Sequence, residues 1–364
     1  MTGKLVFESL RHKPIRTLLS ALLIGVPVTL ILTLVGLSRG MLDETAQRSR
    51  GVGADIVMRP PGTSLLSLSS APMSEKLVDV LRKEPHVTVA TGTVIHPVSG
   101  VTTVTGVDLE TFNKMSGGFT YLQGGPFRQR NDILLGRYYA QQEGVGAGDT
   151  VTLLNREWRV AGVVEEGKLA RIILPIDVLQ DLTANTGKLS QIYLKLDNPG
   201  NIPQVISSLK AKLENYPIYS MEELTSLISV NNVPALRSFI NVMIGIAMVI
   251  GFAVVCLSMY MAVLQRTREI GILKSLGASK GYVLQMILME AAFLGLGGTV
   301  IGIVLSFVAQ FLINTLVPAA LHQAIVPDWW PIALLIALIA ALFGALYPAY
   351  LAARQDPIEA LAYE

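Results

Sequence analysis

Cysteine, histidine and charged residues are all scarce in this sequence. Its 364 residues include one cysteine and four histidines, and only 15% of them are charged. A single cysteine excludes an intramolecular disulfide framework, and the position of Cys256 inside an apolar run indicates a packed side chain rather than a reactive thiol. The histidines form no i, i+4 pair and no HExxH sequence, so we predict no metal site.

Net charge is also nearly absent, since 29 basic residues offset 27 acidic ones. This balance gives no indication of a nucleic-acid partner. A content of 51% hydrophobic residues is too high for a disordered chain. Soluble domains carry about 25% charged residues, so the low charge here favours a membrane protein.

Long apolar runs are what the sequence has in abundance. Uncharged stretches of 22, 28 and 25 residues cover positions 17–38, 238–265 and 329–353. Each exceeds the roughly 20 residues with which a helix crosses the hydrocarbon layer. Residues 280–315 are apolar apart from Glu290, and we expect a surface segment there that leads into a span from about 290 to 316. The first run is too long for a signal peptide and has no cleavage site before Arg39, which predicts an uncleaved span.

Lysine and arginine in the short connections predict the orientation of these spans. Four basic residues lie in residues 1–16 and four in residues 266–280, whereas the turn at 317–328 has none. We therefore expect both chain ends and residues 266–280 in the cytoplasm. The segment of about 200 residues between Arg39 and Arg237 then lies outside.

This outer segment has the pattern of a folded α+β domain. Residues 54–58, 74–83 and 86–95 indicate strand, helix and strand, and residues 191–196, 202–214 and 217–219 repeat that order. The two halves predict a split βαβ sheet. Between them, residues 100–187 are rich in glycine and short β-type runs such as 150–154 and 158–164, which is typical of an inserted small β unit.

Residues 162–169 have the glycine and lysine spacing of a nucleotide-binding loop. However, Leu169 replaces the Ser or Thr that binds magnesium, and Glu165 and Glu166 would place carboxylates against phosphates. The loop also lies in the segment that we place outside the cell. We predict a turn, and we expect that this chain is no enzyme, because it lacks its own nucleotide-binding motif and any G-x-S-x-G nucleophile sequence.

The third apolar segment contains one acid and several glycines. An intramembrane acid such as Glu290 is a candidate proton relay, but ten residues beyond Lys280 it can instead lie at the cytoplasmic interface and pair with a basic residue. We favour this second interpretation. The small residues at 295, 298 and 302 predict close helix packing against a neighbouring span or a second protomer, through Gly295, Gly298 and Gly302.

The short connection at 266–280 is the most informative part of the chain. Ile270, Leu273 and Lys274 fall on one face of a predicted helix, which leaves other charges available to a cytosolic surface. Residues 277–279 can end that helix in a left-handed turn and cap the next one. Alone, such a helix could merely anchor at the lipid surface.

The residues of this connection carry a resemblance to a known family. The sequence REIG at 268–271, followed by K-x-LGA at 274–278, resembles the signature of FtsX-like ABC transporter permeases, the class that contains MacB, LolC and LolE. Residues 10–20, 290–302 and 347–361 are similar to further blocks of that family. In the outer segment, residues 133–136, 144–149 and 160–164 resemble the MacB-type extracytoplasmic domain.

The resemblance implies a fold and a set of partners. It implies an α-helical membrane protein of the bacterial inner membrane, with four transmembrane helices and a large α+β extracytoplasmic domain between the first and second spans. Its partners would be membrane lipid, an ABC ATPase subunit that holds ATP and magnesium, a second permease protomer and a periplasmic adaptor. No cofactor would bind to this chain itself. The residues that match the ATPase-coupling signature are Arg268, Glu269, Ile270, Gly271, Lys274, Leu276, Gly277 and Ala278.

The implied function is that of a permease subunit. ATP hydrolysis on the separate subunit would drive motions of the outer domain that export or extract a lipid-like, lipoprotein, peptide or drug cargo, by mechanotransmission. The alternative is an FtsX-like transmembrane signal transducer that activates an extracytoplasmic cell-wall hydrolase. The predicted organisation is a cytoplasmic N-terminal segment (1–16), a first span (17–38), the outer domain (39–237), a second span (238–265), the coupling segment (266–280), a surface segment and third span (281–316), an outer turn (317–328), a fourth span (329–353) and a cytoplasmic tail (354–364).

The predicted orientation can be tested with single cysteines in a chain from which Cys256 has been removed. Cysteines at Ser99 and Ser207 should react with a membrane-impermeant thiol reagent added to intact cells, and a cysteine at Ser279 should react only after the cells are opened. Labelling at 279 in intact cells would refute the orientation.

Overall fold

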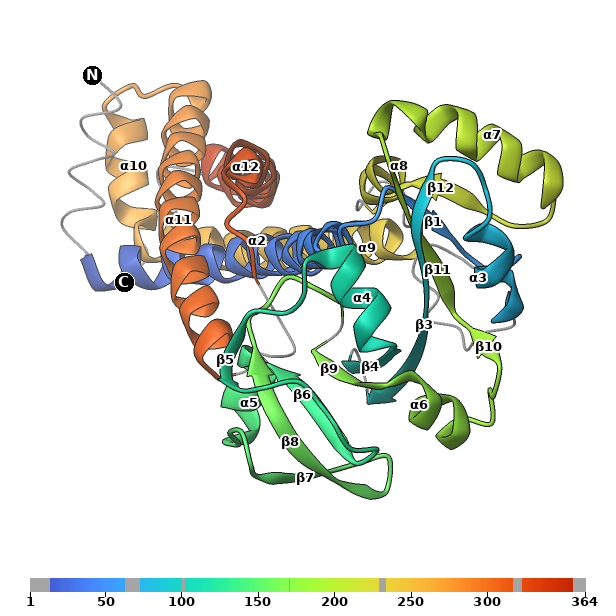
Figure 1. Cartoon of the computed structure of the whole chain (residues 1–364). Helices are drawn as coiled ribbons and strands as arrows, with labels where there is room; N and C mark the ends of the chain where they lie inside the picture. Colours follow the sequence, from blue (N-terminus) through green and yellow to red (C-terminus); the bar gives the residue numbers. More distant parts are fainter. Residues whose placement is uncertain are drawn as a thin grey trace. The chain divides into compact units, whose positions relative to one another are not determined.

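The computed structural model describes residues 14–62, 73–99, 102–169, 171–228, 234–316 and 323–355 (Figure 1). The chain divides into two compact units. The helical unit comprises residues 1–38, 235–312 and 323–364, and the α/β unit comprises residues 39–234 and 313–322. The predicted N-terminal segment up to residue 13, the turn at 317–322 and the tail at 356–364 lie outside the described residues.

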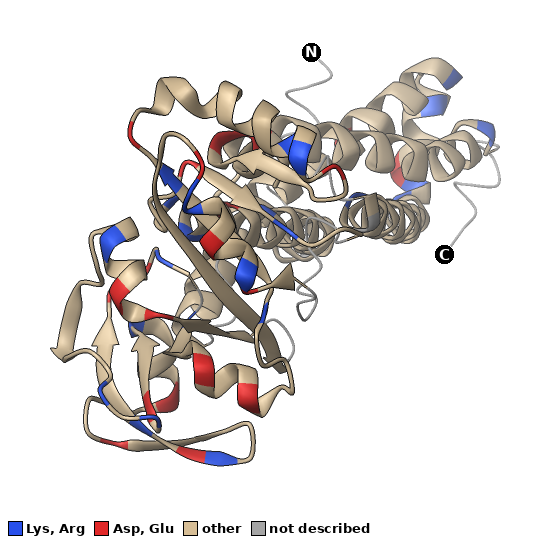
Figure 2. Cartoon of the chain, turned by 45° about the vertical axis from the view of Figure 1, so that its right-hand side comes forward, with Lys and Arg blue, Asp and Glu red and all other residues tan. Residues whose placement is uncertain are grey.

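Four helices in the described part of the chain are long and apolar enough to span a membrane. They are α2 (Pro14–Arg50), α9 (Pro234–Gln265), α11 (Lys280–Leu316) and α12 (Trp330–Arg354). The prediction of four spans, with an α/β domain between the first and the second, is therefore confirmed. Charged residues in these helices are few and lie mainly near their ends, as in the last turns of α2, which contain Arg39, Asp43, Glu44, Arg48 and Arg50 (Figure 2). The described part of this unit also contains two short elements: α10 (Thr267–Ser275) and η3 (Pro327–Trp329).

The third span is part of a longer helix. A surface segment that leads into a span from about residue 290 was expected, and the structure has one helix, α11, that runs without a break from Lys280 to Leu316. No proline and no run of turn-forming residues interrupts this sequence, so the backbone hydrogen bonds continue. Its 37 residues, at about 1.5 Å each, are longer than the hydrocarbon layer is thick, so the helix extends beyond the layer or tilts within it.

Small residues bring the helices of this unit into close contact. A Cβ atom added to Gly302 of α11 would lie 2.6 Å from Cβ of Val28 and 2.8 Å from the carbonyl oxygen of Gly25, both on α2. The Thr29 hydroxyl donates a hydrogen bond of 3.1 Å to the Gly302 carbonyl at the same crossing. Gly298 meets Ile24 of α2 in the same way. The glycines at 298 and 302 therefore pack against a span of the same chain.

The α/β unit contains the two strand–helix–strand patterns in one sheet. The first half consists of β1 (Ile56–Met58), α3 (Lys76–Leu81) and β3 (Val87–Ser99), and the second of β11 (Gln191–Leu196), α7 (Ile202–Lys212) and β12 (Ile218–Ser220). Their strands lie in the order β12-β1-β11-β3, with β1 antiparallel to both β11 and β12. This interleaved order is that of a split βαβ fold, as predicted.

The region at 100–187, predicted as an inserted small β unit, lies between the two halves in the chain and joins their sheet. Its strands extend the same sheet in the order β3-β4-β9-β6-β8-β5, and β7 pairs with β8. The long strand β3 makes this continuity possible, because its residues 87–93 pair with β11 and its residues 93–99 pair with β4. The elements of this region are β4 (Thr102–Val107), α4 (Leu109–Ser116), β5 (Tyr121–Gly124), β6 (Asp132–Gly136), α5 (Arg137–Glu143), β7 (Thr150–Leu153), β8 (Arg156–Val164), β9 (Ile172–Pro175) and α6 (Ile176–Leu182).

The remaining elements of the α/β unit are short. A two-stranded ribbon pairs β2 (Met73–Ser74) with β10 (Lys188–Leu189), and η1 (Pro199–Asn201) precedes α7. The helix α8 (Met221–Leu227) follows β12, and the Ser220 hydroxyl accepts a hydrogen bond from the Glu223 amide at its N-terminus. The core of the unit lies between the sheet and its helices and includes the fully buried Trp158, whose Nε1 donates to the Leu153 carbonyl at 2.9 Å.

A buried carboxylate begins strand β6. The Asp132 side chain is 1% exposed and accepts hydrogen bonds from the Arg159 guanidinium at 2.8 and 2.9 Å. The backbone amides of Arg128 and Gln129 each donate to the same carboxylate at 3.0 Å. The hydrogen bonds from Arg159 are the main reason that the pKa of Asp132 is lowered, and the two amides add to the effect.

Since the pKa of Asp132 is lower in the folded chain than the usual value of about 3.9, its stabilising effect is full above that pH and declines as the pH falls. Asp132→Asn should lower the free energy of unfolding at pH 7 by about 1–3 kcal/mol, and the difference from the parent should shrink below about pH 4. Chemical unfolding in detergent, monitored by tryptophan fluorescence, gives the free energy of unfolding of the variant and of the parent at each pH. Asp79→Asn, at a carboxylate that is 75% exposed, is the control. An equal loss at every pH would contradict the assignment.

The α2–α11 crossing gives a second prediction. Gly302→Val should lower the thermal stability of the purified chain by the equivalent of about 1–3 kcal/mol, because the added carbons would overlap Val28 and the backbone of Gly25. Gly245→Val is the matched control, because a Cβ atom at Gly245 of α9 meets no atom of the described chain within 4 Å. Equal melting temperatures for the two variants would show that this crossing is not tightly packed.

Candidate functional site

The connection between α9 and α11 forms the short amphipathic helix α10. Arg266 leaves helical geometry (φ −118°, ψ 15°) and separates α10 from α9. Ile270 is buried, and Leu273 and Lys274 on the same face are half-buried. The helix expected in this connection is thus present, with one face against the protein and the other free.

A left-handed turn ends α10, as its sequence predicted. Gly277 has φ +98°, and its amide donates to the carbonyl of Lys274 at 3.0 Å. The amide of Ala278 donates to the carbonyl of Leu273 at 3.0 Å, which completes a Schellman motif. The Ser279 hydroxyl then accepts a hydrogen bond from the Tyr282 amide at the start of α11. A residue with a Cβ atom at position 277 would be strained in this conformation.

Two polar contacts hold α10 against its neighbouring helices. The Arg266 guanidinium lies 3.4 Å from the Glu290 carboxylate of α11, and both side chains are nearly buried. The Lys274 ammonium donates to the carbonyl oxygen of Ala353 at 3.0 Å and to that of Gln355, at the C-terminus of α12. A cation at this end of a helix is favourable because the last carbonyl groups there lack helical partners. Glu290 therefore pairs with a basic residue, as we expected.

The eight residues of the predicted coupling signature divide into two groups. Four of them are buried or half-buried against the helical unit, whereas the other four are exposed. The first group is Ile270, Gly271, Lys274 and Ala278, and the second is Arg268, Glu269, Leu276 and Gly277. Within the described part of the chain, Arg268 and Glu269 form no ion pair.

An exposed apolar residue of α10 was missed at the level of sequence. Ile272 is 44% exposed and lies four residues before Leu276, which is 80% exposed. Residues four apart share a helix face, so both lie beside Arg268. The sequence spacing could have shown it, since Ile272 and Leu276 are four residues apart and fall on a different helix face from Ile270 and Leu273. We refer to Arg268, Glu269, Ile272 and Leu276 together as the α10 face.

In the segment that resembles a nucleotide-binding loop, the lysine is bound to backbone carbonyl groups of the same chain. The Lys168 ammonium donates to the backbone carbonyl of Ser116 at 2.9 Å and to that of Gly118. Burial lowers the pKa of this lysine. Gly162 lies within β8, with the backbone of Gly125 against it, rather than in a phosphate-binding loop. Residues 162–164 of this segment thus belong to β8, and residues 166–169 form a bend that follows the strand.

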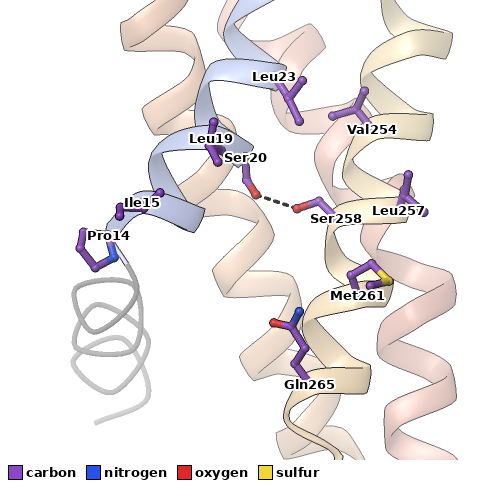
Figure 3. Close-up of a pocket in the computed structure, with 10 residues that line it drawn as sticks. All are labelled: Pro14, Ile15, Leu19, Ser20, Leu23, Val254, Leu257, Ser258, Met261 and Gln265. Carbon is purple, nitrogen blue, oxygen red and sulfur yellow. Dashed lines mark hydrogen bonds between the residues drawn. The ribbon is translucent and has the colours of Figure 1, made fainter.

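An apolar groove of about 820 Å³ lies between α2 and α9 in the helical unit (Figure 3). Leucine, isoleucine and methionine side chains line it, and Leu19 and Leu257 are more than half exposed. The hydroxyl groups of Ser20 and Ser258 form a hydrogen bond of 2.8 Å with each other across it. Among the described residues, no group of three or more His, Cys, Asp and Glu side chains could hold a metal ion.

Comparison with known sequences gives two family matches that together cover most of the chain. The model of the MacB-like periplasmic core domain matches residues 17–212, and that of the FtsX-like permease C-terminal region matches residues 241–357. The chain is 25% identical over 394 aligned residues to the macrolide export ATP-binding/permease protein MacB of Escherichia coli K12, which covers 99% of this chain and 60% of the relative. It is 29% identical over 227 residues to the uncharacterized ABC transporter permease YknZ of Bacillus subtilis, which covers 60% of this chain and 55% of the relative.

A further relative and one solved structure are also similar to parts of this chain. The uncharacterized ABC transporter permease MJ1507 of Methanocaldococcus jannaschii is 27% identical over 60% of this chain and 58% of its own length. The chain thus spans less than two thirds of the length of these three curated relatives. The periplasmic region of MacB from Actinobacillus actinomycetemcomitans aligns with 49% of this chain and 94% of that region, at 16% identity and a TM-score of 0.38.

The long apolar helices, the α/β domain that follows the first of them, and the two family matches agree with one another. The MacB-like match alone covers more than half of the chain. This chain belongs to the FtsX-like ABC transporter permeases with a MacB-like periplasmic core domain.

Proposed function

We propose that this chain is the permease subunit of an ABC transporter and that the α10 face is its contact with a separate ATPase subunit. ATP and magnesium bind to that ATPase, and this chain hydrolyses no nucleotide itself. The helices carry the resulting displacement to the α/β unit, whose motion exports or extracts a lipid-like, lipoprotein, peptide or drug cargo.

The observation that carries this proposal is the contrast between the two sides of α10. One side is held by the Lys274 and Arg266 contacts to α12 and α11. The other side presents the α10 face, with Leu276 80% exposed next to charged residues. An apolar residue surrounded by charges suits a protein contact, and a firmly held helix can transmit force from it to two spans.

The proposed orientation places α10 in the cytoplasm and the α/β unit outside the inner membrane. The Lys and Arg content of residues 266–280 supports it, since basic connections remain on the cytoplasmic side. A second permease protomer and a periplasmic adaptor complete the proposed complex. The apolar groove between α2 and α9 supports contact with membrane lipid.

The names of the relatives support a transport role, since the E. coli protein MacB is described as a macrolide export ATP-binding/permease protein. A cargo that is apolar or partly so fits a mechanism in which the outer unit moves, because no charged or polar channel through the helices is then needed.

The proposed contact is tested by changing the α10 face in the full-length chain. Leu276→Asp and Glu269→Lys should each weaken co-purification of the ATPase subunit that accompanies the parent chain, by the equivalent of about 1–3 kcal/mol per residue. Gly277→Val should have a similar effect, because it strains the turn at φ +98°. ATP hydrolysis by the purified complex and the amount of chain in the membrane are measured alongside.

Val80→Asp, at a residue of α3 that is 57% exposed, introduces the same charge on the α/β unit and should leave ATPase binding unchanged. Normal ATPase binding by all three α10 variants would place the contact elsewhere in the chain. Absence of any co-purifying ATPase with the parent chain would refute the proposed function itself.

A further inference from the structure

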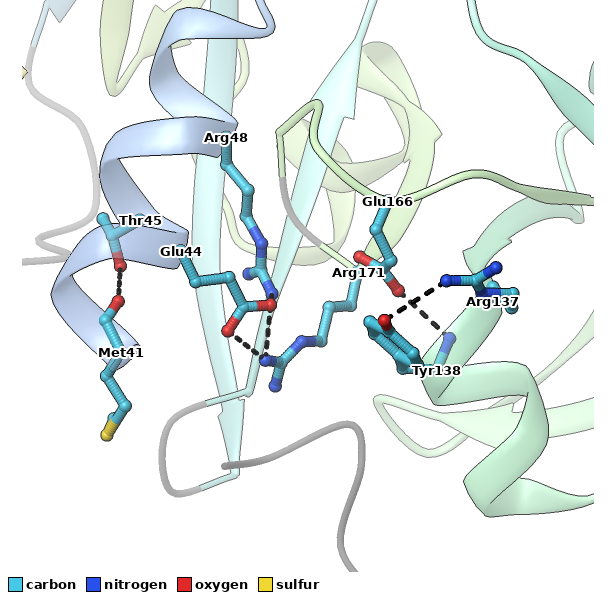
Figure 4. Close-up of polar contacts among 8 residues, drawn as sticks. All are labelled: Met41, Glu44, Thr45, Arg48, Arg137, Tyr138, Glu166 and Arg171. Carbon is cyan, nitrogen blue, oxygen red and sulfur yellow. Dashed lines mark hydrogen bonds and ion pairs between the residues drawn. The ribbon is translucent and has the colours of Figure 1, made fainter. Parts of the chain in front are cut away.

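Three charged side chains meet inside the α/β unit where the last turns of α2 reach strand β9, and Glu166 lies close to them (Figure 4). The Arg171 Nη2 atom lies 2.9 and 2.8 Å from the two carboxylate oxygens of Glu44, and the Arg48 guanidinium pairs with the same carboxylate. The Glu166 carboxylate accepts a hydrogen bond of 3.1 Å from the Tyr138 amide, and the Arg137 guanidinium donates to the Tyr138 hydroxyl at 3.2 Å.

Burial makes this cluster difficult to separate. The Arg171 side chain is 7% exposed, and Glu44 and Arg48 are each 19% exposed. Removal of one partner from such a pair would leave a charge without compensation in a poorly hydrated place, which is strongly unfavourable. Among the described residues, the buried Nε atoms of Arg48 and Arg171 have no hydrogen-bond partner, which costs stability. The cluster therefore adds little stability, but it fixes the position of the end of α2 relative to Arg171.

Helix α2 is connected to the sheet at two places, through the chain to β1 and through the ion pair beside β9. After Arg50 the chain passes through residues 51–55 into β1, so α2 is covalently attached to the half of the sheet that contains β1. The pair of Glu44 and Arg171 attaches α2 to the other half, beside β9. Three strands, β11, β3 and β4, lie between β1 and β9.

A second contact lies next to the ion pair. A Cβ atom added to Gly51 would lie 1.8 Å from the carbonyl oxygen of Gly167, so the end of α2 and the loop before β9 touch through their backbones. Lys168 ties that loop to the end of α4. These contacts place Gly167 against the end of α2 and Lys168 against the end of α4.

We propose that the pair of Glu44 and Arg171 is a joint that fastens α2 to the part of the sheet that contains β9. The β1 part of the sheet, the β9 part and the end of α2 then move as one body. Its use as a relay rests on the proposed function, since a displacement of α2 would then reach the whole α/β unit rather than the β1 half alone. Glu44 and Arg171 are positioning residues in this role.

The joint is tested by a distance measurement in the full-length chain with Cys256→Ala. Spin labels are placed on cysteines at Ser207 in α7 and at Glu157 in β8, which are exposed and lie in the two halves of the sheet. The parent should give one narrow distance peak. The double variant Glu44→Gln, Arg171→Met removes both charges together, and we expect loss of that single narrow peak while the chain remains folded.

A matched control removes an exposed ion pair of the same unit, Glu110 with Lys114, as Glu110→Gln, Lys114→Met, and should keep the narrow peak. Thermal unfolding and tryptophan fluorescence identify a variant that has simply lost its fold. In that case the single variant Arg171→Lys, which keeps the charge but shortens the reach, is used in its place and should broaden the peak. A narrow peak in a folded variant without the pair would overturn the proposal.

A further arm adds the ATPase subunit and a non-hydrolysable ATP analogue. The peak of the parent should remain narrow, because both halves move together, and that of the double variant should change with nucleotide. A nucleotide-dependent change in the parent would overturn the joint. If the peak broadens in the double variant but no ATPase binds to either chain, the joint stands and the proposed function fails.

Discussion

Close packing between small residues holds the helical unit together, because lipid removes most of the hydrophobic gain that joins helices in water. The buried face of α12 contains only alanine, glycine and proline, whereas its large side chains, such as Leu335 and Phe343, are about 60% exposed. The glycines of α11 allow the same approach to α2. The position of α10 depends on this packing, since its two polar anchors are Glu290 of α11 and the C-terminus of α12.

The two proposed functional elements use buried or shielded polar contacts in the same way. Lys274 and Arg266 fix α10 to the spans, and the pair of Glu44 and Arg171 fixes the end of α2 to β9. Such contacts add little stability because of the desolvation that they require, but they permit few alternative geometries. A chain that transmits displacement needs defined geometry at the points where force enters and leaves one of its units.

Much of this architecture could be predicted from sequence, because apolar runs and the periods of strands and helices are local signals. The four spans, the interleaved βαβ halves and the left-handed turn at Gly277 were found in this way. The continuous sheet was missed, since pairing of β4 with β9 joins residues about 70 positions apart. The anchoring of Lys274 and the pairing of Glu44 with Arg171 were also hidden, because each joins side chains from distant elements.

The interleaved sheet also constrains the order in which the chain acquires its fold. Strand β1, at residues 56–58, has both of its partners far along the chain, at residues 192–194 and 218–220. During synthesis it must wait unpaired for more than 130 residues, whereas β6, β7 and β8 find one another within about 30. Contacts of such long sequence separation form slowly and leave strand edges exposed in the meantime. The half of the sheet that continues directly from the first span is therefore the last to be completed, and a chain truncated before residue 218 would leave β1 without one of its two neighbours.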